Sequence, residues 1–172
     1  MLNGNNQEIL KLVNAGYKKT EIESICKKDN TIYYKKYYNS RFGFSFLYPS
    51  SLLTLKELPS NGDGVKLFNR NHTAELIANA YFSSDDNIKK IYKDEINYLE
   101  NSNKKITYKA LKKNWFVISG IDYSKNQIFY EKRYLINGIL SGFIFKYPIS
   151  KKNIYDKTIS KISHSFKPSK GG

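Results

Sequence analysis

The stretch Tyr38-Asn39-Ser40-Arg41-Phe42-Gly43-Phe44-Ser45-Phe46-Leu47-Tyr48-Pro49 decides how the rest of the chain is interpreted. Aromatic residues recur at every second position over 42–48, so they fall on one face of a β-strand. Pro49 ends the strand because proline cannot donate a hydrogen bond to the next strand. Residues 31–38 before it are also rich in tyrosine, a good strand former. A β-rich domain is therefore predicted to begin near residue 31.

On the N-terminal side of this stretch, residues 6–28 predict a pair of short helices. Asn14-Ala15-Gly16 is typical of a helix end, and Thr20 with Glu23 forms a capping box that starts the second helix. In sequence, the pair resembles a helix-turn-helix. Its second helix carries Glu21 and Glu23, which phosphate groups repel, so we favour a docking appendage over DNA binding.

On the C-terminal side, period-two and helical patterns alternate. They predict strands at 52–58, 65–68, 74–82, 106–111, 115–121, 127–136 and 139–147, and helices at 84–101 and 150–166. Ser84 and Ser150 are the expected first residues of the helices, and Asn137-Gly138 is typical of a tight hairpin turn. Strands joined by hairpins imply an antiparallel sheet. We therefore expect an α+β fold, a central antiparallel β-sheet with helices packed on it.

Several segments together resemble the Mog1/PsbP-like domains, including bacterial PsbP-like proteins. Residues 38–49 resemble their opening strand, and 61–64 (Asn-Gly-Asp-Gly) resemble the glycine-rich turn that follows. Trp115–Gly120 with Phe129-Tyr130 resembles their central hairpin, and 147–168, with Ser165-Phe166, resembles their ending. The resemblance implies a sheet-and-helix sandwich, binding to other proteins, and no catalytic residues to transfer. It divides the chain into a helical appendage (1–30), a PsbP-like domain (31–168) and a flexible tail (169–172).

The chain has 172 residues, and its 29 Lys and Arg against 15 Asp and Glu give a net charge of +14. Two explanations remain open. Lysine, asparagine, isoleucine and tyrosine are abundant together, which the codon bias of an AT-rich genome produces without selection for binding. Alternatively, the charge attracts an acidic protein, nucleic acid or anionic lipid. Only 3 of the 29 basic residues are arginine, the residue that grips phosphate and guanine best.

No group of residues predicts catalysis, a metal site or a cofactor. His72 and His164 are far apart in sequence, and the single cysteine, Cys26, has no histidine at a spacing that suggests a pair. The loop at 61–64 resembles a calcium loop only superficially, because the twelfth position is His72 rather than glutamate. We therefore predict a protein that is not an enzyme and has no evident small-molecule substrate.

The predicted function is a protein-binding accessory module whose basic, tyrosine-rich surface engages an acidic macromolecular partner. Tyrosines interleaved with lysines suit protein interfaces, and they also stack on nucleic-acid bases. A lysine-driven binder of nucleic acid or anionic membrane is the alternative. The residues expected to contact the partner are Tyr33, Tyr34, Lys35, Lys36, Tyr37, Lys151, Lys152, Lys157 and Lys161.

The sequence leaves the compartment open. No apolar run approaches the length of a membrane span, and residues 1–6 are not followed by the apolar core of a signal peptide. A cytoplasmic location is expected if Met1 is native. A location in the cell envelope is expected if the sequence begins after a removed export signal.

Overall fold

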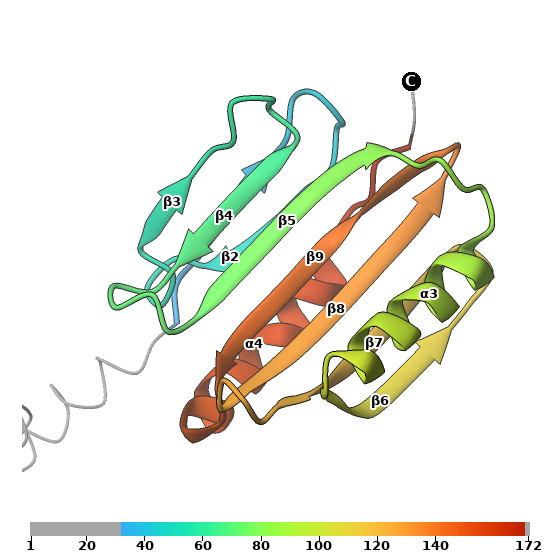
Figure 1. Ribbon diagram of the computed structural model, residues 1–172. Helices are drawn as coiled ribbons and strands as arrows, with labels where there is room; N and C mark the ends of the chain where they lie inside the picture. Colours follow the sequence, from blue (N-terminus) through green and yellow to red (C-terminus); the bar gives the residue numbers. More distant parts are fainter. Residues whose placement is uncertain (1–31, 171–172) are drawn as a thin grey trace, which may run out of the picture. The chain divides into compact units, whose positions relative to one another are not determined.

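A computed structural model of the chain describes residues 32–170 (Figure 1). The elements in this range are β1 (Tyr34–Tyr38), β2 (Ser45–Pro49), β3 (Leu55–Glu57), β4 (Gly64–Phe68), β5 (Glu75–Phe82), α3 (Ile88–Asn101), β6 (Lys105–Leu111), β7 (Trp115–Asp122), β8 (Gln127–Ile136), β9 (Ile139–Pro148), the 3-10 turn η1 (Ile149–Lys151) and α4 (Lys152–Ser165). Their order agrees with the prediction of five strands, a helix, four strands and a helix. The helix pair predicted at 6–28 and Cys26 lie outside the described residues.

Seven strands form one antiparallel sheet in the order β3-β4-β5-β9-β8-β7-β6, and β1 pairs with β2 in a separate hairpin. The first and second halves of the chain meet where β5 pairs with β9, with Ala78 opposite Phe143. Strands β8 and β9 are joined at Asn137-Gly138, whose φ angles of 49° and 74° suit a two-residue hairpin turn. The predicted hairpin and the antiparallel α+β fold are confirmed.

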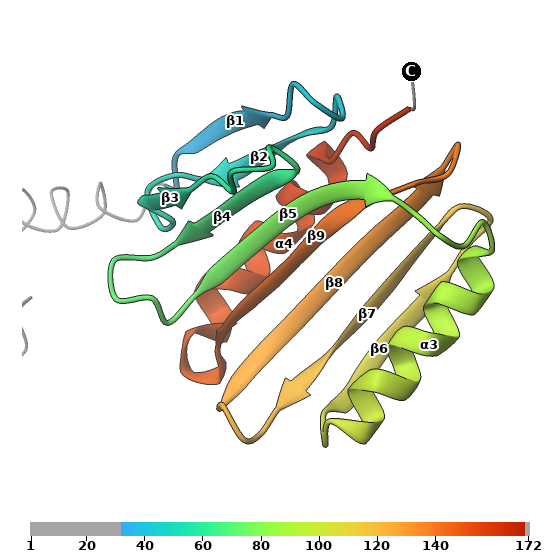
Figure 2. The ribbon, with the colours of Figure 1, turned by 45° about the horizontal axis from the view of Figure 1, so that its top comes forward.

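The sheet is covered on both faces, by different elements (Figures 1 and 2). Helix α4 and the β1–β2 hairpin pack on one face, and α3 packs on the other over the β6–β8 end. Alternation along β9 explains the two cores, because Phe143, Phe145 and Tyr147 point toward α4 while Leu140 points toward α3. The alternating aromatics of this strand are therefore core residues.

The aromatic stretch at 42–48 is a strand only in its second half, which corrects the prediction of a strand over all of it. Asn39 closes a turn in front of β2, accepting hydrogen bonds of 2.8 Å from Phe42 N at its side chain and from Gly43 N at its carbonyl. Gly43 has a φ of +70°, which glycine adopts without steric cost. Phe42 and Phe44 are still buried, at 8 % and 0 % exposure. The turn therefore buries Phe42 and Phe44 although neither residue lies in the strand.

Phe166, which follows α4, joins the helix, the hairpin and the sheet. Its ring is stacked on Phe44, Phe46 and Tyr134, with centroids 5.8, 5.9 and 5.7 Å away. The ring of Phe143 on β9 lies 5.7 Å away on a tilted plane. Phe166 is 5 % exposed. One side chain thus contacts β2, the turn before it, β8 and β9.

The segment after Phe166 is fixed to its neighbours. Lys167 and Ser45 exchange two backbone hydrogen bonds, of 2.8 and 3.0 Å. Ser169 is 1 % exposed and donates its N–H to Ser141 Oγ, and Asn137 Nδ2 donates to the carbonyl of Lys170 at 2.6 Å. Ser169 and Lys170, which the sequence assigns to a flexible tail, thus contact β9 and the β8–β9 turn. Hydrogen bonds of this kind leave no periodic signal in the sequence.

Both helices begin later than predicted. Helix α3 is capped by Asn87, whose side chain accepts from Lys89 N and Lys90 N, and not by Ser84. Before α4, Ser150 lies inside the turn η1, and Lys151 occupies the cap position without a side-chain hydrogen bond. When two residues close together could each cap a helix, the local sequence does not show which one does. The position at which the preceding strand ends decides where the helix begins.

Helix α3 brings a carboxyl group onto the sheet together with its apolar stripe. The stripe of Ile88, Ile91, Tyr92, Ile96 and Leu99 packs around Phe116, Ile118 and Phe129. Beside it, Glu95 meets the buried pair of Glu131 and Arg133, whose Oε1 and Nε are 2.6 Å apart. Burial, reinforced by the charge of Glu131, raises the pKa of Glu95 from 4.5 to about 7.

Replacing Phe166 by alanine is expected to reduce the free energy of unfolding by roughly 3–5 kcal/mol, because a buried ring shared by several elements is lost. Denaturant unfolding followed by circular dichroism measures the change. Phe82→Ala is the matched control, since that ring is 73 % exposed, and it should stay within about 1 kcal/mol of the wild type. Equal losses in both variants would show that the Phe166 cluster does not hold the fold together.

Replacing Glu95 by glutamine is expected to flatten the dependence of stability on pH. The folded state holds the Glu95 proton more tightly than the unfolded chain, so stability falls as pH rises from 4.5 to about 7 and stays reduced above that window. Glutamine cannot ionise, so the variant should melt at a higher temperature than the wild type at pH of about 8. Thermal unfolding at several pH values measures this, with the exposed Glu100→Gln on the same helix as control. A Glu95→Gln profile parallel to the wild type contradicts the assignment.

Candidate functional site

The structure brings the two predicted groups of binding residues together at one contact. Lys161 on α4 places its Nζ 4.1 Å from the centroid of the Tyr34 ring on β1. A cation over a tyrosine face is a favourable interaction. Partial burial also raises the pKa of Tyr34. Residues more than 120 positions apart in sequence therefore belong to one surface.

Tyr37 is the exception among the predicted residues, and the structure corrects its role. It is 8 % exposed, its hydroxyl donates to Gly64 O at 2.9 Å, and its ring packs against Phe44 and Phe46. Alternation along β1 turns Tyr37 toward the sheet while Tyr34 and Lys36 face outward. The sequence does not show which tyrosines of a Tyr-Lys repeat are buried, because tyrosine suits both environments.

The remaining predicted residues are accessible. Tyr33 is 65 % exposed, and the lysines Lys35, Lys36, Lys151, Lys152, Lys157 and Lys161 are all exposed. Among the residues that the structure describes, only Lys152 of these six lysines forms an ion pair. Its partner is Asp156, one turn further along α4. We call the outward-facing residues Tyr34, Lys36, Lys151, Lys157 and Lys161 the basic surface.

Helix α4 with its tail and the hairpin carry a large share of the positive charge, and the β6 segment 104–113 adds five lysines with no acidic residue. Residues 151–170 contain six lysines and one acidic residue, and residues 33–56 contain four basic residues and no acidic residue. Helix α3, on the opposite face of the sheet, has three lysines and three acidic residues. The lysine excess of α4 and the hairpin is therefore larger than that of α3.

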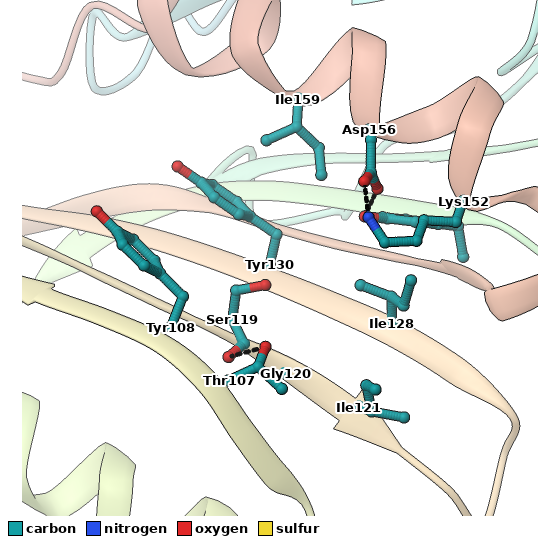
Figure 3. A pocket seen from close by; sticks show the side chains of 11 residues that line it. Thr107, Tyr108, Ser119, Gly120, Ile121, Ile128, Tyr130, Lys152, Asp156 and Ile159 are labelled. Atoms are coloured by element: carbon teal, nitrogen blue, oxygen red, sulfur yellow. Dashed lines mark hydrogen bonds and ion pairs between the residues drawn. The ribbon is translucent and has the colours of Figure 1, made fainter.

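A pocket of about 500 Å³ lies between α4 and strands β6–β8 (Figure 3). Ile121 and Ile128 line it from the sheet, and Ile159 lines it from the helix. Figure 3 shows Tyr108 and Tyr130 pointing out from their strands in the same direction. The volume and the mostly apolar lining are typical of pockets that receive a small molecule or a side chain.

The polar groups of this pocket are hydroxyls and one ion pair. Tyr147 donates its hydroxyl to Asp156 Oδ1 at 2.7 Å, and Lys152 pairs with the same carboxylate. Burial, with the negative charge of Asp156, raises the pKa of Tyr147, and burial also raises the pKa of Tyr130. The tyrosines are therefore neutral hydrogen-bonding groups near neutral pH. They can hold a ligand, but they are not poised to accept protons from it.

Lys132, next to this pocket on β8, is a feature that the sequence analysis missed. Its Nζ lies 5.1 and 5.2 Å from the ring centroids of Trp115 and Tyr134 and donates to Ser163 Oγ at 2.9 Å. Burial lowers the pKa of Lys132. In the sequence, Lys132 is one polar residue of an alternating strand pattern, and no neighbouring residue indicates that α4 covers it.

The two histidines do not meet. His72 lies in the turn between β4 and β5, and His164 on α4 directs Nδ1 toward the carbonyl of Ser160 at 2.6 Å. Among residues 32–170, no three His, Cys, Asp or Glu side chains are grouped to hold a metal ion. No helix in that range is long and apolar enough to cross a membrane.

Comparison with known proteins gives a fold and no family. No protein-family model matches the chain, and the search of curated proteins found no match. Among solved structures, the fold is similar to cyanobacterial PsbP (CyanoP) from Synechocystis sp. PCC 6803, with a TM-score of 0.60 and 11 % identity over 80 % of this chain and 94 % of that chain. At this identity the likeness shows the fold alone. The described domain therefore has a PsbP-like α+β fold.

Proposed function

We propose that this chain is a non-enzymatic accessory module of the Mog1/PsbP-like kind, whose basic surface binds an acidic macromolecular partner, most favourably a protein. The excess of lysine on α4 and the hairpin, compared with the balanced charge of helix α3, is the observation that carries the proposal. The α4 and hairpin side has a large excess of lysine, and α3 is balanced.

Unpaired lysines on one side of a domain produce a directional field. Such a field speeds encounter with an acidic surface and disfavours basic partners. Tyr34, held under Lys161, adds apolar contact area within the same surface. Tyrosine is enriched in protein interfaces because it buries a large ring and keeps a hydroxyl for hydrogen bonding.

The pocket beside α4 supports binding to a protein rather than to a featureless polyanion. Lys152 lies at the edge of both the pocket and the basic surface. A partner that docks on α4 can therefore insert an apolar side chain between Ile128 and Ile159. Buried anchors of this kind contribute much of the affinity of protein interfaces, whereas exposed charge pairs contribute little.

Binding to nucleic acid or to an anionic membrane remains the second candidate, since lysine attracts any polyanion. Its affinity would fall steeply with salt, because binding releases counterions. The basic surface as defined contains no arginine, which is the main donor to guanine and a strong phosphate ligand. This composition favours the protein partner.

Reversing the charge of the basic surface is expected to abolish partner binding. The variant Lys151→Glu/Lys157→Glu/Lys161→Glu should recover at least about tenfold less of a stoichiometric partner from native lysate than the wild type. The control Lys89→Glu/Lys93→Glu/Lys113→Glu changes the net charge equally at exposed lysines away from α4 and should recover the wild-type amount. Quantitative mass spectrometry of the captured proteins measures the difference.

The same three proteins are titrated with duplex DNA, single-stranded DNA and anionic vesicles at about 50 mM salt. Binding to one of these that depends on the α4 lysines, without a protein partner, supports the second candidate and overturns the first. If the two triple variants capture the partner equally well, the basic surface is not the binding site.

A further inference from the structure

A second pocket, of about 480 Å³, lies where the β1–β2 turn meets the segment after α4. Figure 2 shows this last segment passing beside the turn, and the Ser45–Lys167 bridge joins the two. We call it the hairpin–tail pocket. Four of the residues that line it are basic, namely Lys36, Arg41, Lys167 and Lys170.

The backbone at each of these cations is held in place. Lys36 lies in β1, opposite Leu47. Lys167 exchanges two hydrogen bonds with Ser45, and the carbonyl of Lys170 accepts from Asn137. The positive side chains therefore start from fixed positions around one hollow, which reduces the entropy lost when they close on a ligand.

Arg41 is oriented by its neighbours. Its Nη1 donates to the carbonyl of Asn61, and its guanidinium lies 5.0 Å from the centroid of the Phe42 ring. The other Nη and the Nε remain to form a paired hydrogen bond with an oxyanion, which is the geometry that distinguishes arginine from lysine.

None of the described residues that line the pocket is acidic. The carboxylate of Asp63 is connected to Arg41 only through Asn61, whose Nδ2 it binds at 2.8 Å, and it does not line the pocket. Like charges around one hollow repel one another, and a bound anion relieves that repulsion.

We propose that the hairpin–tail pocket binds a molecule that carries two or more phosphate groups, either free in solution or as the headgroup of a lipid. Four separated cations exceed what one phosphate group can contact. The volume is within the range of small-molecule pockets. Tyr38, which is 62 % exposed, also lines the pocket and can donate its hydroxyl to a phosphate oxygen.

This inference does not depend on the proposed function. The basic surface shares only Lys36 with the pocket, and the variants that test the surface change α4 lysines that do not line it. A failure of either proposal therefore leaves the other standing.

Isothermal titration with inorganic tripolyphosphate tests the proposal. The double variant Arg41→Gln/Lys167→Gln should bind at least about tenfold more weakly than the wild type. Lys89→Gln/Lys93→Gln, which removes the same charge from α3, should differ from the wild type by less than about twofold. A second double variant, Lys36→Gln/Lys170→Gln, leaves the Arg41–Asn61 contact in place and should also lose affinity.

Amide spectra with added tripolyphosphate locate the site. Shifts at Gly43, Ser45 and Lys167 are expected, and the unbound variant spectra report whether each variant is folded. Vesicles with and without phosphatidylinositol 4,5-bisphosphate separate the lipid headgroup from the free phosphate compound. Absence of binding, or equal weakening in the pocket and α3 variants, overturns the proposal.

Discussion

The ring of Phe166 is the contact on which the arrangement of the domain depends. It is stacked on Phe44, Phe46 and Tyr134 and packed against Phe143, so the end of α4, the β1–β2 hairpin and the sheet share one cluster. Aromatic pairs at these separations add to the free energy of burial, and densely packed rings do not slide past one another. The hairpin therefore cannot move relative to α4 without opening the core. The contact of Lys161 with Tyr34 on the surface follows from this packing underneath it.

The sheet separates two electrostatic environments. On the α3 side, acidic and basic residues are equal in number along the helix, and the carboxyl group of Glu131 is buried beside Arg133. On the α4 side, lysines outnumber carboxylates, and the apolar pocket lies between that helix and the strands. The fold supplies a scaffold that hosts different functions in different proteins. The proposed function therefore depends on the side chains of one face of the sheet rather than on the fold.

The sequence predicted the order of elements and the antiparallel sheet, because these depend on period-two and helical patterns. The sequence predicted a strand where Asn39 and Gly43 form a turn, because alternating aromatic residues can be buried both by a strand and by a turn. Helix starts at Ser84 and Ser150 were wrong because neighbouring residues compete for the cap. For the site, the exposed lysines of α4 are visible in the sequence. The burial of Tyr37, the covered position of Lys132 and the meeting of Arg41 with Lys167 are not, because each depends on contacts between distant segments.

In the proposed function, one face, formed by α4 and the hairpin, contacts the partner. Chemical labelling of lysines, measured residue by residue by mass spectrometry with and without the captured partner, tests it most directly. We expect slower labelling of Lys36, Lys151, Lys157 and Lys161 in the complex, with unchanged labelling of the exposed α3 lysines Lys89 and Lys93. Protection of Lys89 and Lys93 with unchanged labelling on α4 would contradict it and assign the binding face to the other side of the sheet.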